Sequence, residues 1–254
     1  MSRSQSGRVL ASHVENDLRA LRNPEKAAFF PRFFKAEPGG YAEGDQFLGV
    51  IVPDLRKIAK RCVNLEPAQL SKLFRSKWHE CRLTAVFILV QKFEAAHRDC
   101  KSGKTPASEP KQWVDFYLDH LDFVNNWDLV DASAHKILGV WFLDDPKQRS
   151  LMRKLANSKD LWRQRVAVIS NFPLIKSGQH AEILELAERF LHHKHDLMHK
   201  AVGWMLREMG KNNLAALRGF LQQYAAEMPR TMLRYSIEKL SPAERKKWMH
   251  QKAD

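Results

Sequence analysis

The sequence has few cysteines, no long apolar run and little strand pattern. Three cysteines occur among its 254 residues: Cys62, Cys81 and Cys100. They are odd in number and form no CxxC pair, which argues against a disulfide scaffold and a thiolate zinc site and fits a reducing cytosol. The longest apolar run, 83–90, is too short to cross a bilayer. Glu15 and Asp17 interrupt the N-terminal segment before a signal-like apolar region forms. We therefore expect a cytoplasmic protein that does not enter a membrane.

Sequence motifs for cofactors are also missing. The chain contains no GxxxxGK[ST] loop and no GxGxxG fingerprint, which argues against nucleotide-dependent chemistry. A histidine cluster at His192, His193, His195 and His199 includes an i,i+4 pair, but no HExxH pattern or nearby cysteine accompanies it. A solvated helix start therefore explains the cluster better than a metal site does. We expect neither a metal ion nor a cofactor.

Helix start signals are frequent along the chain. Proline lies just inside four expected helix starts, at Pro24, Pro67, Pro146 and Pro242. Asp145 with Gln148, and Ser241 with Glu244, have capping-box spacing. Strand alternation is nearly absent, and no Asn-Gly or Asp-Gly hairpin signal occurs. This pattern predicts an all-α protein.

Two polar stretches interrupt the helical pattern, at 37–46 and 101–110. Both contain glycine and proline and are expected to be loops. Neither is long or biased enough to separate two domains. We therefore expect a single domain over residues 1–254.

Positive charge is spread along the whole chain. The sequence has 42 Lys+Arg against 29 Asp+Glu, a net charge of +13. An even distribution favours a folded basic surface over a disordered basic arm, and such a surface suits nucleic acid. Charge that serves only solubility is the alternative.

Three expected helices each carry one chemically unusual residue. Projected at about 100° per residue, the stretch 127–142 places Asp131 inside an apolar arc. The stretch 161–172 places Arg165 near the centre of its own arc. Trp204 instead faces away from the apolar face of its helix. Three cationic residues lie beside it on the helical wheel: Lys200, Arg207 and Lys211.

The spacing of these three residues indicates a repeat. Asp131, Arg165 and Trp204 are separated by intervals close to the length of one helical hairpin. Equivalent helices of successive repeats would line one concave face of a curved α-solenoid. Accidental spacing in an irregular bundle is the alternative.

Each unusual residue has a functional and a structural interpretation. Asp131 is either half of an ion pair with Arg165 or a carboxylate that faces a cationic substrate. Arg165 has the donor geometry to bind a phosphate. Trp127, one turn before Asp131, is either a core residue or an aromatic platform. Trp204 suits stacking on bases or sugars, or anchoring a protein partner.

Several segments together resemble the AlkD-like DNA alkylation-repair glycosylases, whose fold is a curved stack of HEAT-like helical repeats. The similarity runs from about Val9 to Leu240. The segments that carry it are Asn23-Pro24-Glu25-Lys26, Phe47-Leu48-Gly49-Val50, Trp127-Asp128-Leu129-Val130-Asp131, Trp162-Arg163-Gln164-Arg165 and Gly203-Trp204-Met205-Leu206-Arg207-Glu208.

The resemblance implies an activity and assigns roles to particular residues. It implies hydrolysis of the N-glycosidic bond of cationic alkylated purines, such as 3-methyladenine and 7-methylguanine, in double-stranded DNA. It also implies that the base is not flipped into a pocket, unlike in most enzymes that act on bases. Asp131 matches the catalytic aspartate, Trp127 and Trp204 match an aromatic pair around the deoxyribose, and Arg165 matches a phosphate contact. Phe33 falls where the active branch has a tyrosine.

Further DNA contacts are expected from Lys200, Arg207 and Lys211. We also expect that the protein acts as a monomer.

The chain departs from the active branch in having Asn126-Trp127 where that branch has two tryptophans. It also lacks the hydroxyl at Phe33 and has a Gly/Pro-rich insertion near 38–46. These departures keep open a second function, non-catalytic binding of branched or distorted DNA. A HEAT-type protein-interaction scaffold is a third.

Overall fold

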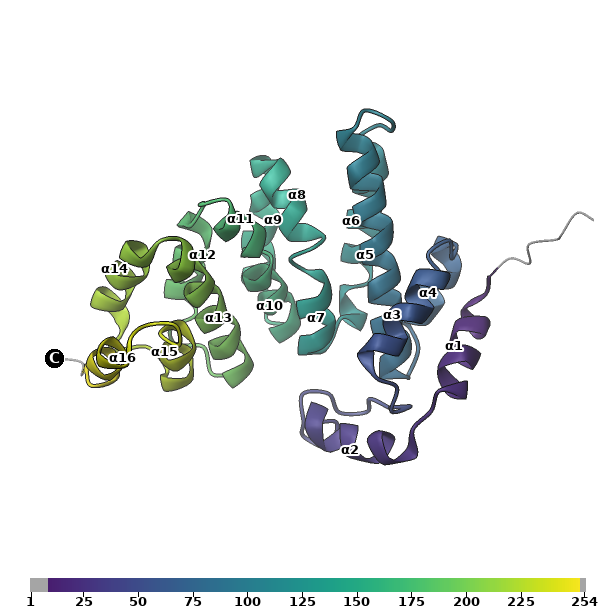
Figure 1. Ribbon diagram of the computed structural model, residues 1–254, viewed down its shortest axis with the longest axis horizontal. Helices are drawn as coiled ribbons and strands as arrows, with labels where there is room; N and C mark the ends of the chain where they lie inside the picture. Colours follow the sequence, from purple (N-terminus) through teal and green to yellow (C-terminus); the bar gives the residue numbers. More distant parts are fainter. Residues whose placement is uncertain (1–8, 252–254) are drawn as a thin grey trace, which may run out of the picture. The chain divides into compact units, whose positions relative to one another are not determined.

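The computed structural model describes residues 9–251, which form helices joined by turns and loops (Figure 1). The chain divides into two compact units, with the boundary between Ser133 and Ala134. Among the described residues the one strand-like contact is an isolated parallel bridge between Gln46 and Trp78. The prediction of an all-α protein is confirmed.

Unit 1 is built around one long helix, α5, which packs against α1, α3, α4, α6 and α7. Figure 1 shows α5 and α6 as the two long limbs of a hairpin. The helices of this unit are α1 (Ala11–Ala20), α2 (Pro24–Phe34), α3 (Val52–Arg61), α4 (Pro67–Phe74), α5 (His79–Lys101), α6 (Ser108–Asp119), η1 (Leu121–Phe123) and α7 (Trp127–Ser133).

The first half of α5 is buried on every side. Each residue from 79 to 90 is shielded from solvent, including His79, Glu80 and Arg82. A helical segment that is apolar on every side must lie within a core. This accounts for the apolar run 83–90, which is too short to span a membrane. None of the described helices combines the length and apolarity that a bilayer span requires. The three cysteines are free thiols.

The stretch 37–46 is a loop, as predicted, and it is attached to the rest of unit 1 at both ends. The Ala42 amide donates to the carbonyl of Lys35, which ends α2 in the left-handed conformation. Gln46 receives a hydrogen bond from the His79 amide and donates one to the Lys77 carbonyl. The end of the loop is thereby fixed beside the start of α5.

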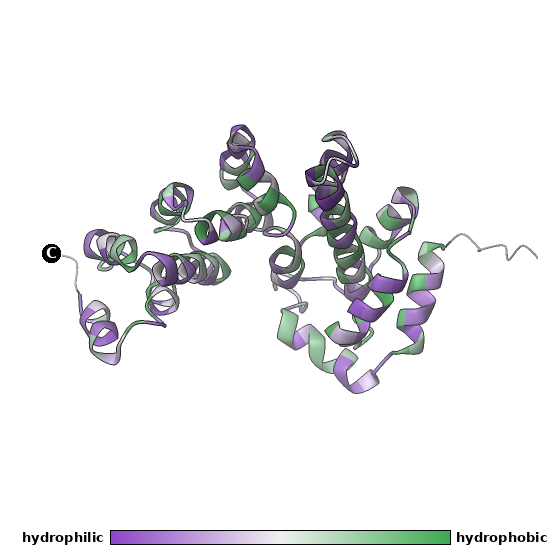
Figure 2. Cartoon of the chain, turned by 45° about the horizontal axis from the view of Figure 1, so that its top comes forward, coloured by the Kyte–Doolittle hydropathy of each residue, from purple (hydrophilic) through white to green (hydrophobic). Residues whose placement is uncertain are grey.

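Unit 2 is centred on α13, which packs against α10, α11, α12, α14 and α15. Figure 2 colours each residue by hydropathy, and hydrophobic and hydrophilic residues lie side by side along most of the helices. The helices of this unit are α8 (Leu138–Asp144), η2 (Pro146–Gln148), α9 (Arg149–Ala156), α10 (Leu161–Ile169), α11 (Phe172–Lys176), α12 (Ala181–Arg189), α13 (Asp196–Asn212), α14 (Leu214–Tyr224), α15 (Arg230–Ser236) and α16 (Pro242–Met249).

The single helix expected over 127–142 is wrong, because α7 ends at Ser133 and α8 begins at Leu138. The Ser133 hydroxyl donates back to the Leu129 carbonyl, a bond that disturbs helices. The Gly139 amide then bonds the carbonyl five residues earlier, at Ala134, so the turn between the helices is widened.

The helix expected over 161–172 ends earlier, at Ile169, and Phe172 begins the short helix α11. Pro173 supplies no amide proton and therefore cannot continue the hydrogen bonding of α10. The predicted helix starts at Pro24, Pro67 and Pro242 are confirmed, and Pro146 begins a 3-10 turn.

Candidate functional site

An aromatic cluster in unit 1 joins α2 to the start of α7. The rings of Phe33 and Trp127 meet edge to face with centroids 5.9 Å apart. Phe34 stacks on Trp127 at 5.5 Å and on Phe47 at 5.2 Å. Phe34 is buried, whereas Phe33 is 50% exposed. Two of the predicted site residues, Phe33 and Trp127, are therefore brought into contact at an open edge.

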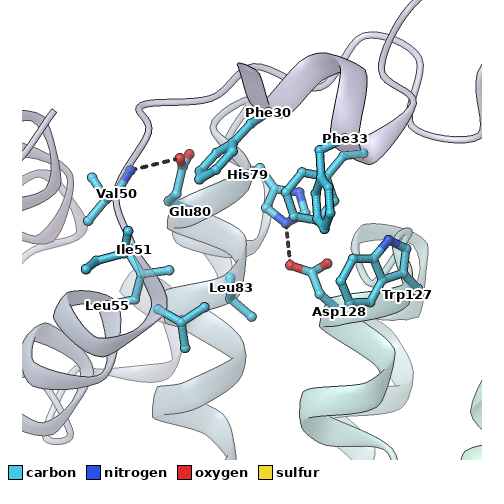
Figure 3. A pocket seen from close by; sticks show the side chains of 12 residues that line it. Phe30, Phe33, Val50, Ile51, Leu55, His79, Glu80, Leu83, Trp127 and Asp128 are labelled. Atoms are coloured by element: carbon cyan, nitrogen blue, oxygen red, sulfur yellow. Dashed lines mark hydrogen bonds and ion pairs between the residues drawn. The ribbon is translucent and has the colours of Figure 1, made fainter. Parts of the chain in front are cut away.

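A cavity of about 330 Å³ opens beside this cluster (Figure 3). Its lining comes from α2, the segment 50–52, α3 and the first turns of α5 and α7. The lining is largely aromatic and aliphatic, and its polar members are His79, Glu80 and Asp128. No sequence pattern indicated this cavity.

A buried network of charges lies behind the aromatic rings. The two ring nitrogens of His79 face two carboxylates, with Nδ1 3.1 Å from Asp45 and Nε2 2.8 Å from Asp128. Arg82 completes the network with an ion pair of 2.6 Å to Asp45. The network links the loop 37–46, the start of α5 and the first turn of α7. Because Asp128 directly follows Trp127, the network also fixes the backbone beside Trp127.

The network determines the protonation of its central histidine. Burial alone lowers the pKa of His79, but the carboxylates of Asp128 and Asp45 outweigh it and raise that pKa to about 9. For Asp45, burial raises the pKa, but His79 and Arg82 bring it below its ordinary value. At neutral pH the histidine is a cation between two carboxylates, and both of its N–H groups donate.

Glu80, the next residue on α5, holds the segment that follows the loop. Its carboxylate accepts hydrogen bonds from the amides of Leu48, Gly49 and Val50 at 2.8 to 3.3 Å. Gly49 has a φ of +84°, and a Cβ there would lie 2.2 Å from the Asn23 carbonyl oxygen. The segments Asn23-Pro24 and Phe47–Val50 are thus one structural unit, with Glu80 as its buried acceptor.

Asp131 lies on α7, one turn after Trp127, and is half-buried. Residues four apart lie on the same face of a helix, so the carboxylate and the Trp127 ring share a face. Burial raises the pKa of the nearby Tyr117 phenol, and the negative charge of Asp131 adds to that rise. The Tyr117 hydroxyl is hydrogen-bonded to Ser133 at 2.8 Å. The catalytic role of Asp131 stays a prediction.

The remaining predicted residues belong to unit 2. Arg165 is 4% exposed, in agreement with its position in the apolar arc of α10. Its Nη1 donates to the carbonyl of Leu197 at 2.5 Å, near the start of α13. The guanidinium thus helps to fix α10 against α13. The structural alternative drawn from the sequence was an ion pair with Asp131, not this bond to a backbone carbonyl.

Trp204 has the orientation expected for it. The core face of α13 is fully buried, whereas Trp204 is half-exposed and its ring lies 6.3 Å from that of Phe172. Gly203, beside it, permits close packing, since a Cβ there would lie 2.6 Å from the Met232 carbonyl oxygen. The buried residues of the core face are Met198, Val202, Met205, Leu206 and Met209.

The cationic side chains around Trp204 are paired with acids. Lys200 contacts Asp196 at 2.8 Å, and Lys211 contacts Glu208 at 2.6 Å. Arg207 pairs with Glu238 and also approaches Glu208. Glu208 is buried, and Lys176 lies 3.9 Å from it. The pair of Lys200 with Asp196 is exposed and therefore weak. Lys211 and Arg207 instead neutralise the buried Glu208, which would lose its partners if both turned away.

The histidine cluster serves the start of α13. The His195 side chain accepts a hydrogen bond from the Leu197 amide at 3.1 Å, and His193 contacts Gln164 at 2.9 Å. Burial is the main cause that lowers the pKa values of His193 and His195, and neighbouring histidines add to it. His195 caps α13, so the cluster lies at a helix start, where the sequence analysis placed it.

Sequence reasoning missed the buried network of Asp45, His79, Arg82 and Asp128. A signal was present, because three ionisable residues, His79, Glu80 and Arg82, directly precede the apolar run 83–90. Such residues are almost never buried unless they are paired. Their partners lie on distant segments, so sequence spacing could not identify them.

Comparisons with known proteins place the chain in a family. A family model described as DNA alkylation repair enzyme matches residues 14–240. A solved structure described as a predicted DNA alkylation repair enzyme from Enterococcus faecalis superposes with a TM-score of 0.66 at 16% identity. That match covers 87% of this chain and 97% of the other. No curated protein sequence matches significantly. The fold is the helical-repeat class expected from the resemblance, and the chain belongs to the DNA alkylation repair enzyme family.

Proposed function

We propose that the protein is a DNA glycosylase that hydrolyses the N-glycosidic bond of cationic alkylated purines in duplex DNA, without a metal ion or cofactor. The observation that carries this proposal is the shared face of α7, where Asp131 follows Trp127 by one turn and Phe33 closes the aromatic edge. A carboxylate beside aromatic rings suits a sugar on which positive charge develops.

The chemistry needs little beyond this arrangement. A base that already carries a positive charge leaves as a neutral molecule, taking the electron pair of the broken bond. The carboxylate of Asp131 stabilises the oxocarbenium-like sugar, and water then adds to its anomeric carbon and loses a proton to the carboxylate or to solvent. Lys200, Arg207 and Lys211 are proposed contacts of the DNA backbone. The resemblance assigns Trp204 to the sugar and Arg165 to a phosphate, although Arg165 is 4% exposed and would have to turn outward to reach one.

The test is release of methylated bases from methylated duplex DNA. The wild-type protein should release 3-methyladenine or 7-methylguanine, and Asp131→Asn should release far less while it binds DNA equally well. Absence of any release above the Asp131→Asn level, with DNA binding intact, would sink the catalytic proposal. Binding itself should weaken steeply as salt rises.

A second function, non-catalytic binding of branched or distorted DNA, has one observation in its favour. Asn126 is fully buried and its side chain accepts from the Trp127 amide at 2.8 Å, so it adds no second ring beside Trp127. This function predicts selective binding of branched over linear duplex DNA, with no effect of Asp131→Asn on any measured property.

A further inference from the structure

The last two helices of unit 2 carry a local excess of positive charge. Residues 229–251, which contain α15 and α16, hold six Lys+Arg against two Glu, and all six cationic residues are exposed. The cations beside Trp204, in contrast, are paired with acids, among them the buried Glu208. The exposed cations of this end of the chain are Arg230, Arg234, Lys239, Arg245, Lys246 and Lys247.

The two acids of this segment do not neutralise its charge. Glu238 pairs with Lys239 and with Arg207 of α13, and Glu244 pairs with Arg218 of α14 at 2.8 Å. Among residues 9–251, no acid forms an ion pair with Arg234 or with the basic run 245–247 of α16. An anion can therefore bind these cations without breaking an existing ion pair.

The basic run 245–247 lies on a helix that is fastened to unit 2. Trp248 packs inward and is 5% exposed. The Nη2 of Arg230, at the start of α15, donates to the Met249 carbonyl at 2.8 Å and so joins α15 to the end of α16. Because successive residues of a helix point about 100° apart, the run covers the exposed sides of α16. These charges are thus held on a folded surface and can meet an anion of fixed shape.

The surface continues from α16 over α15 toward Trp204. Figure 1 shows α13, α15 and α16 next to one another at this end of unit 2, and α13 packs against α15. Tyr235 of α15 is 36% exposed, and a Cβ on Gly203 would lie 2.6 Å from the Tyr235 Cβ. Since Gly203 precedes Trp204, Tyr235 and the unpaired Arg234 lie on the helix that flanks the exposed surface around Trp204.

We propose that the exposed cations of α15 and α16 form a second surface that binds the phosphates of duplex DNA, beside the surface around Trp204. A duplex offers a regular row of phosphates, which suits cations fixed on two neighbouring helices. Such contacts position the DNA and carry no sequence preference. α16 lies beyond residue 240, where the match to the family ends, so this surface is a feature of the present chain. The inference rests on DNA as the partner, which the family implies, and not on base release.

The test is the salt dependence of binding to an undamaged duplex of about 30 base pairs, or about three helical turns. Each phosphate contact that is lost should lower the slope of log affinity against log salt by about 0.9. The triple variant Arg245→Gln, Lys246→Gln and Lys247→Gln should therefore bind more weakly, with a slope that is smaller by about 2–3. Arg234→Gln tests the same surface from α15 and should lower the slope by about one.

A matched control removes the same charge elsewhere in unit 2. Lys147→Gln, Lys154→Gln and Lys159→Gln together replace three exposed lysines outside α15 and α16. This control should keep a slope close to that of the wild-type protein. Thermal unfolding of each variant checks the fold, and Arg234→Gln alone decides the matter if the α16 triple variant does not fold.

Each outcome decides one way. Smaller slopes in the α16 triple variant and in Arg234→Gln, with little change in the control, support the second DNA surface. Slopes equal to wild type overturn it, and so does an equal reduction in the control, which would reflect net charge alone. Tighter binding of poly-glutamate than of the duplex, lost in the α16 triple variant, also overturns it, in favour of an acidic protein partner. Because the duplex is undamaged, a protein that shows the expected slopes but releases no base refutes the glycosylase proposal alone.

Discussion

The buried His79 makes a sharp prediction about stability and pH. Its pKa is raised from 6.5 to about 9 by Asp128 and Asp45, against the effect of burial. The folded protein therefore holds a proton that the unfolded chain releases between these two values. By linkage, the stabilisation that His79 contributes is fully present below about pH 6.5 and is lost as pH rises toward about 9.

The magnitude follows from the size of the shift. One pKa unit corresponds to about 1.4 kcal/mol, so the rise to about 9 amounts to a loss of about 3 kcal/mol at the alkaline end. His79 is 2% exposed, so solvent screens this interaction little. Burial raises the pKa of the Cys81 thiol to about 12 from 9.0, and this thiol lowers stability only above pH 9. The window below pH 9 therefore isolates the histidine.

Urea unfolding at a series of pH values, followed by circular dichroism, measures the effect. In His79→Gln, the free energy of unfolding should change little between about pH 6.5 and about pH 9. At neutral pH this variant should be less stable than wild type by about 3–5 kcal/mol, because the two carboxylates lose their cationic partner. His192→Gln, at a side chain that is 80% exposed, is the control and should keep the wild-type profile. A wild-type profile that is flat over this window would refute the assigned protonation, as would an NMR titration of the His79 ring with a midpoint near 6.5.

Three further substitutions test the packing around the site. Glu80→Gln removes the charge that three amides share and should cost about 1.5–3 kcal/mol, with faster amide exchange at Leu48 and Val50; unchanged exchange would contradict this role. Gly49→Ala forces a positive φ on alanine, which costs about 1–3 kcal/mol from backbone strain alone, and a melting temperature equal to that of wild type would argue against it. Gly203→Ala should cost about 1–3 kcal/mol by overpacking, whereas Gly219→Ala, with no atom within 4 Å of the added Cβ, should be neutral or stabilising; the opposite order in thermal denaturation would refute the close packing of α13 and α15.

Local signals predicted much of the fold. Proline at helix starts, such as Pro24 and Pro242, fixes φ near its helical value, and this acts within a few residues. The apolar face of α13 and the outward Trp204 follow from helical periodicity in the same way. The break between α7 and α8 was missed because it depends on hydrogen bonds made by Ser133 and on a widened turn at Ala134. Periodicity contains no information about such contacts.

The candidate site was predictable only in part. The resemblance indicated Phe33 and Trp127, and these rings do meet. The network at His79 was not predictable from spacing, because Asp45 and Asp128 reach it from 34 and 49 residues away in sequence. Pairing over such distances is set by packing, which only the folded structure specifies.

The ion pair between Asp45 and Arg82 limits how this chain can change over time. Asp45 lies in the Gly/Pro-rich loop, a kind of segment that normally tolerates insertion and deletion. Here, loss of the loop would leave two buried cations, His79 and Arg82, facing one remaining carboxylate at Asp128. A shortened loop therefore requires a neutral residue in place of Arg82 at the same time. We expect that related chains with a shorter loop also have a neutral residue at position 82, so that the two features covary.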